Sequence, residues 1–109
     1  MGPSLQALEN QYFLLRSSLP TLTAQGATQD QLDRLRSLIV QARTNYWTAL
    51  NKTLHDDDPS VVALTTQMNA EQMNIDAAVK HLGNIAKVLD LITKAVDIGS
   101  QIVAKAVSL

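Results

Sequence analysis

The sequence contains no cysteine and few of the residues that make turns or strands. Without cysteine, disulfides, thiolate catalysis and cysteine-based zinc sites are excluded. Four glycines and three prolines in 109 residues predict few turns and long elements. Aromatic residues make up only 4% of the chain, whereas apolar residues make up 46%. This balance favours helices that pack through Leu, Ile, Val and Ala, so we expect an all-α protein.

An excess of basic charge is also missing. Nine basic residues stand against ten acidic residues, which gives a net charge of −1. Because proteins that bind nucleic acid usually carry a basic surplus, we expect no nucleic-acid partner. Residues 1–11 lack the basic and apolar segments of a signal peptide, and no transmembrane segment is expected. A chain of this length predicts one helical domain over residues 1–109, and a cytoplasmic location is favoured.

Apolar spacing and helix-end signals predict three helical segments. Pro20 is expected to end the first, because proline disfavours helical geometry in the residue before it. Thr28 and Gln31 form a capping-box pattern that starts the second. Asp58 and Pro59 suit the N-cap and the first helical position of the third. The predicted helices span about residues 4–19, 28–55 and 59–107.

The predicted third helix contains a glycine, Gly83, at a point where a helix could end. The heptad pattern of apolar residues nevertheless continues through Gly83 without a change of register. We therefore favour one long C-terminal helix, bent or broken at Gly83, in an antiparallel hairpin or coiled-coil-like bundle of three to four helices. The alternative is an up-down-up-down four-helix bundle with a turn at Gly83.

If the second and third predicted helices pack as a hairpin, residue numbers that sum to about 114 lie opposite each other. This register pairs Arg43 with Glu71, which would explain an acidic residue on an apolar seam. It also predicts the apolar pairs Leu35–Val79, Ile39–Ile75, Tyr46–Met68, Leu50–Leu64 and Leu32–Leu82. The first helix would cover the remaining length of the third, with Tyr12 over the gap left by Gly99.

The segment from residue 80 to residue 107 is apolar around most of its circumference. An arc wider than about 100° indicates more than one neighbouring helix. Three interpretations are open: the central helix of a monomeric bundle, a surface for self-association, and a helix that binds lipid or a partner. We favour self-association, as a dimer, because a hairpin alone would expose a large apolar patch. The predicted interface residues are Trp47, Val88, Leu91, Ala95, Ile98 and Ile102.

No arrangement of residues that supports catalysis is recognisable. His55 precedes three aspartates, but four adjacent side chains point in different directions, so a capped turn is the better interpretation. Met68 and Met73 are expected to fill a core or an interface. We expect no catalytic, metal or cofactor site, and no glycine-rich phosphate loop is present.

The sequence thus predicts a non-enzymatic helical module for protein–protein interaction that self-associates and binds another protein. It would act as an adaptor, a small chaperone-like partner, or a secretion or immunity accessory factor of the kind found in bacteria. The alternative is a peripheral membrane-active protein that lays its amphipathic C-terminal helix on a membrane surface.

Overall fold

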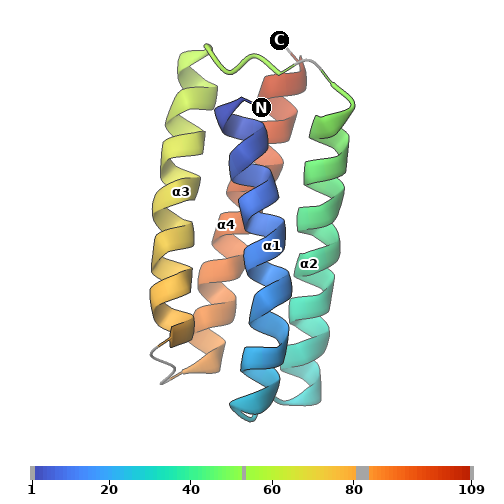
Figure 1. The fold of residues 1–109 in the computed structure, drawn as a ribbon, viewed down its shortest axis with the longest axis vertical. Coiled ribbons are helices and arrows are strands. Elements are labelled where there is room, and N and C mark those ends of the chain that lie inside the picture. The colour runs from blue at the N-terminus through green and yellow to red at the C-terminus, as the bar shows by residue number, and fades with distance from the viewer. Residues whose placement is uncertain (1, 53, 81–83, 109) are drawn as a thin grey trace.

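The structure, a computed structural model, describes residues 2–52, 54–80 and 84–108. These residues form four α-helices and no strand: α1 (Pro3–Ala24), α2 (Gln29–Leu50), α3 (Pro59–Lys80) and α4 (Ile85–Ser108). The helices run up and down the long axis of a bundle that measures 42 × 21 × 19 Å (Figure 1). The predicted all-α bundle is confirmed.

The bundle consists of two antiparallel hairpins, α1–α2 and α3–α4, that lie side by side (Figure 1). Helix α1 packs beside α3, and α2 packs beside α4. Helices α1 and α4 also touch across the centre, whereas the described parts of α2 and α3 make no contact. The connection from α2 to α3 therefore crosses one end of the bundle, where α1 begins and α4 ends. The predicted register, which pairs the second helix with residues 64–82, is wrong.

Helix α1 continues through Pro20 to Ala24, so its predicted end at residue 19 is wrong. Proline removes one backbone hydrogen bond, but Leu22 is buried in the core just beyond it. The Thr23 hydroxyl also donates to the Leu19 carbonyl at 2.8 Å, within the same turn. Tertiary packing thus outweighs the local signal. The helix ends before Gly26, which has a positive φ of 89°.

The two predicted helix starts are confirmed. The Gln31 backbone N–H donates to the Thr28 hydroxyl, and the Gln31 side chain accepts from the Thr28 backbone N–H. The Asp58 carboxylate accepts from the backbone N–H groups of Ser60 and Val61. The end of α2 comes earlier than predicted, at Leu50 instead of near residue 55.

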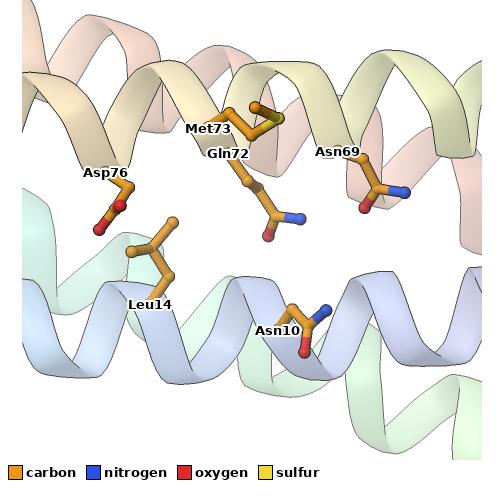
Figure 2. Close-up of a pocket in the computed structure, with 6 residues that line it drawn as sticks. All are labelled: Asn10, Leu14, Asn69, Gln72, Met73 and Asp76. Carbon is orange, nitrogen blue, oxygen red and sulfur yellow. The ribbon is translucent and has the colours of Figure 1, made fainter.

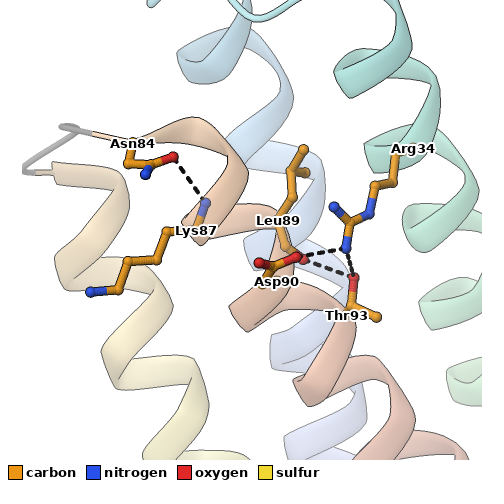
Figure 3. Close-up of polar contacts among 6 residues, drawn as sticks. All are labelled: Arg34, Asn84, Lys87, Leu89, Asp90 and Thr93. Carbon is orange, nitrogen blue, oxygen red and sulfur yellow. Dashed lines mark hydrogen bonds and ion pairs between the residues drawn. The ribbon is translucent and has the colours of Figure 1, made fainter.

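The single long C-terminal helix is wrong, and the four-helix alternative describes the chain. Helix α3 ends at Lys80, and α4 begins afresh with Asn84, whose side-chain oxygen accepts from the Lys87 backbone N–H at 3.2 Å (Figure 3). The predicted bend at Gly83 lies outside the described residues. An unbroken heptad pattern does not prove an unbroken helix, because two helices that face one core can share it.

The wide apolar arc of the C-terminal segment is covered by helices of the same chain. Side chains of α4 pack against α1, α2 and α3 in two core clusters. The buried apolar residues of α4 are Val88, Leu89, Ile92, Ala95, Val96, Ile98 and Ile102. Burial of each large apolar side chain stabilises the fold by about 1.5–3 kcal/mol.

One polar side chain from α1 reaches the centre of the bundle. The buried Gln11 amide donates to the Ala95 carbonyl of α4 at 2.7 Å. It fits because Gly99 lies opposite: a Cβ there would stand 2.8 Å from Gln11 Oε1. The prediction that α1 fills the gap at Gly99 therefore holds for the helix, but the residue is Gln11 and not Tyr12.

Candidate protein-binding face

The outer side of the α1–α2 hairpin carries a concentration of large and cationic side chains. All four aromatic residues and all four arginines of the sequence lie in α1 and α2. We call the outer set the aromatic–arginine face; it consists of Phe13, Arg16, Arg36, Val40, Arg43, Trp47 and Leu50. Phe13, Val40, Trp47 and Leu50 are each about half exposed.

Helical spacing places these residues together. On α2 the numbers 36, 40, 43, 47 and 50 alternate by four and three, which is the spacing of one stripe along a helix. A second stripe of α2, at Leu35, Ala42, Asn45 and Ala49, is buried in the core. The exposed stripe therefore lies on a separate side of α2 from the core.

Aromatic contacts join the two helices along this face. The Tyr12 ring stacks on Phe13, with centroids 5.5 Å apart, and on Tyr46 of α2 at 6.3 Å. The Arg16 guanidinium lies 5.3 Å from the centre of the Tyr12 ring, and the Arg43 guanidinium lies 5.0 Å from that of Trp47. These cation–π contacts hold the arginine side chains beside apolar surface, where a partner could contact both.

A hydrogen bond closes one end of the aromatic cluster. The Tyr46 hydroxyl donates to Glu9 Oε2 at 2.7 Å. This hydrogen bond raises the pKa of Tyr46 above its ordinary value of 10.0, and burial and the negative charge of Glu9 act in the same direction. The phenol therefore keeps its proton, and its link between α1 and α2, throughout the neutral range.

A hollow of about 400 Å³ opens on the same face between the two helices. Its walls are Arg16, Leu19, Arg36, Ile39 and Val40, and none of the acidic residues in the described part of the chain lines it. Arg36 also pairs with Asp33 at 3.3 Å, but both side chains are more than half exposed, so this ion pair is weak. An apolar floor between two guanidinium groups suits a carboxylate that is attached to an apolar group.

The fourth arginine serves the fold instead of this face. Arg34 Nη2 donates to Asp90 Oδ1 at 3.0 Å and to the Thr93 hydroxyl at 2.9 Å (Figure 3). Thr93 in turn donates to the Leu89 carbonyl at 2.8 Å. These contacts link α2 to α4 on the other side of α2.

Among the predicted interface residues, the structure places only Trp47 on an open surface, with 53% of its area exposed. Val88, Ala95, Ile98 and Ile102 are buried inside the bundle of the single chain, and Leu91 is half-buried. These α4 residues do not form an exposed face, because α1, α2 and α3 already cover the helix. The structure also separates them from Trp47, which lies on the outside of α2.

The predicted pair Arg43–Glu71 is wrong. Arg43 stacks on Trp47, and Glu71 instead pairs with Lys94 of α4, whose Nζ lies 3.0 Å from Glu71 Oε1. The reason is the topology: α2 and α3 lie at opposite corners of the bundle, so Arg43 faces away from Glu71. The acid on the seam is explained by α4, not by α2.

Sequence reasoning missed Phe13, Arg16, Arg36, Val40 and Leu50 as residues of one surface. The four-three spacing of the α2 stripe was a signal that could have found three of them. The sequence instead predicted that Leu50 packs against Leu64, but α2 does not contact α3 in this fold. The contribution of α1 needed the tertiary structure, because only the hairpin brings Phe13 and Arg16 beside α2.

The acidic turn after α2 has structural contacts. Asp56 Oδ1 accepts from the Ser4 backbone N–H at 3.1 Å and also from the Ser4 hydroxyl, so it ties the turn to the start of α1. Within the described ranges, no group of three or more metal-ligating side chains comes together. No helix in the described part of the chain is long and apolar enough to cross a membrane.

Comparisons with protein-family models, with curated proteins and with solved structures found no match for this chain.

Proposed function

We propose that the chain is a non-enzymatic helical module that binds another protein through the aromatic–arginine face. The observation that carries this proposal is the continuous α2 stripe in which Arg36 and Arg43 alternate with the half-exposed Val40, Trp47 and Leu50. Trp, Tyr and Arg are the residues that contribute most to binding energy at protein interfaces. A gathering of exposed large apolar side chains is uncommon on a protein surface that has no partner.

The chemistry of the face defines the kind of partner. Its hollow offers aliphatic walls and the guanidinium groups of Arg16 and Arg36, without a lining acid. The stripe follows an α-helix for about 21 Å, from residue 36 to residue 50 at ~1.5 Å per residue. We infer that the partner presents an amphipathic helix in which Asp or Glu flanks large apolar side chains. The arginines supply charge-assisted hydrogen bonds, and the apolar side chains supply buried area.

The test uses a model peptide helix of about 16 residues in which Leu and Glu recur at helical spacing. Calorimetry should show saturable binding to the protein, and Arg43→Glu should weaken it about tenfold or more through charge repulsion. Lys87→Glu is the matched control, because it makes the same charge change at an exposed position of α4. Equal losses in both variants would contradict the assignment to this face and indicate a general charge effect.

Self-association and membrane binding are each tested by a separate experiment. Self-association stays a prediction. Light scattering of the protein alone over a wide concentration range measures it. Vesicles that contain anionic lipid test the membrane alternative. Vesicle binding that Arg43→Glu removes, in a protein that ignores the acidic peptide, would assign the face to a lipid surface and overturn the proposal.

A further inference from the structure

A second groove runs between α1 and α3, on another side of α1 from the aromatic–arginine face. A hollow of about 350 Å³ is lined by Asn10, Leu14, Asn69, Gln72, Met73 and Asp76 (Figure 2). A second hollow of about 210 Å³ is lined by Pro3, Asp56, Val62, Thr65, Thr66 and Asn69. Asn69 lines both hollows, so they adjoin along α3, and we call the two together the α1–α3 groove.

Two buried polar side chains line this groove without satisfying their hydrogen-bonding capacity. Gln72 Oε1 and the Thr65 hydroxyl have no hydrogen-bond partner among the described residues, and both residues are more than nine-tenths buried. Figure 2 shows the Gln72 side chain extending from α3 toward α1. A buried acceptor without a donor destabilises a fold, and leucine at the same core position would avoid this. Gln72 therefore points to a ligand that donates a hydrogen bond.

The surface of the groove has a distinctive chemistry. Met73, at its edge, is 74% exposed and is the most exposed large apolar residue described. The acidic residues that line the groove are Asp56 and Asp76, and among the described residues no basic side chain lines either hollow. Lys80 pairs with Asp76 at 2.9 Å from outside the hollow, but both side chains are more than half exposed. A flexible methionine beside carboxylates and amide oxygens suits a cationic partner with apolar side chains.

We propose that the α1–α3 groove binds an amphipathic helix that carries Lys or Arg beside large apolar side chains. The groove extends along α3 from Val62 to Asp76, about 21 Å at ~1.5 Å per residue, which matches four turns of a docked helix. The apolar side chains of the partner helix pack on Met73 and Leu14. A cationic N–H group of the partner donates to Gln72 Oε1 when α1 and α3 separate enough to admit it. The site goes beyond the aromatic–arginine face: it uses a different pair of helices and selects the opposite charge.

The experiment uses the whole protein and a peptide of about 16 residues in which Leu and Lys recur at helical spacing. We expect saturable binding by calorimetry. Gln72→Leu should raise the melting temperature, because the unpartnered amide is removed. It should also weaken binding of the Leu–Lys peptide about tenfold, because the acceptor for the peptide's N–H group is lost. Gln67→Leu is the matched control: it makes the same change at an exposed position of α3 outside the two hollows. This control should bind the peptide as the native protein does.

Met73→Ala provides a second variant that acts on the surface alone. It should weaken binding of the Leu–Lys peptide severalfold without changing the melting temperature of the protein, since the Met73 side chain is largely exposed. Arg43→Glu, which tests the aromatic–arginine face, should leave this peptide's affinity unreduced. The two proposals can therefore fail separately.

Three results would overturn the proposal. Unchanged peptide affinity in a stabilised Gln72→Leu variant would mean that the amide has a structural role only, with water as its partner. Binding that Trp47→Ala removes and Met73→Ala leaves intact would place the peptide on the other face. A rise in the mass of the protein alone, removed by Met73→Ala, would identify a second copy of this chain as the occupant.

Discussion

The two hairpins of the bundle have the same architecture but distribute their apolar residues differently. In the α3–α4 hairpin, α4 alone contributes seven of the buried apolar residues described, and the outside of α3 is largely small or polar, as at Ala63, Ala70 and Asn74. In the α1–α2 hairpin, large apolar and aromatic side chains remain on the outside. The α3–α4 hairpin supplies ten of the 18 buried apolar residues described. The α1–α2 hairpin carries four of the six exposed large apolar residues described, and the other two are Val62 and Met73 of α3.

The difference lies in the side chains and not in the helices themselves. Both hairpins pair helices of similar length, from 22 to 24 residues. Each also contains a helix with a polar cap, which is Thr28 in α1–α2 and Asp58 or Asn84 in α3–α4. Helix α2 could have carried alanine or glutamine at positions 40 and 47 without loss of its core stripe. That it carries Val40 and Trp47, together with the neighbouring arginines, is what the proposed binding function explains.

The largest expected effect is on the free energy of unfolding, which should respond very differently to substitutions in the buried arc of α4 and in the exposed stripe of α2. Ile92→Ala, in the core, should lower the free energy of unfolding by about 2–5 kcal/mol, because it removes buried methyl groups and leaves a cavity. Val40→Ala should change it by less than about 0.5 kcal/mol. Urea denaturation measures both. Comparable losses would show that Val40 is buried in solution and that the contrast between the hairpins is false.

The next effect concerns binding. Trp47→Ala should weaken binding of the acidic Leu–Glu helix by about 2 kcal/mol or more, since a tryptophan beside an arginine typically contributes much of the binding energy at an interface. Val62→Ala, at an apolar residue of α3 that is similarly exposed, should leave the affinity unchanged. Calorimetry with both variants measures the difference. Equal weakening would mean that any exposed apolar side chain suffices and that α1–α2 has no special role.

The helix starts should behave alike in the two hairpins. Thr28→Ala removes the cap of α2, and Asp58→Ala removes the cap of α3. Each should lower the free energy of unfolding by about 1 kcal/mol, because backbone N–H groups lose their acceptor. Denaturant titration of the two variants gives the comparison. A loss in one hairpin several times that in the other would show that their helices do differ in intrinsic stability.

The smallest effect is a pH dependence of stability that comes from the contact between Tyr46 of α2 and Glu9 of α1. Because folding raises the pKa of Tyr46 above 10.0, its hydrogen bond to Glu9 stabilises the fold below that pH. The contribution is lost as the pH rises through the folded-state pKa and the phenol ionises. Tyr46→Phe should therefore be less stable than the native protein at neutral pH, and the gap should shrink in strongly alkaline solution. A gap that is constant with pH would mean that the hydrogen bond contributes nothing.

Local features of the fold were predictable, whereas the choice between the possible arrangements of the helices was not. The starts at Thr28 and Asp58 followed from residues within one turn of each other, which is the range over which a cap acts. The passage of α1 through Pro20 was not predictable, because it depends on the burial of Leu22 among other helices. The sequence also indicated correctly that α4 needs several neighbours. It left open whether the same chain or a second copy provides them, and the favoured interpretation was a second copy.

The candidate site was predictable only in part, because the register between two helices is ambiguous in the sequence. Heptad stripes can be aligned on almost any partner helix, so the predicted pairing of Arg43 with Glu71 had no independent support. Trp47 was among the predicted interface residues, and it is exposed in the structure. The rest of the aromatic–arginine face depends on the contact between α1 and α2, which a stripe on one helix cannot specify.

The most direct measurement of the central claim is the fluorescence of Trp47, the only tryptophan in the chain, during titration with the acidic Leu–Glu helix. If the aromatic–arginine face is the binding site, the emission should shift to shorter wavelength and saturate as the half-exposed indole becomes buried. The basic Leu–Lys helix should leave the emission unchanged. Saturable binding of the acidic helix without any change in Trp47 emission would contradict the account.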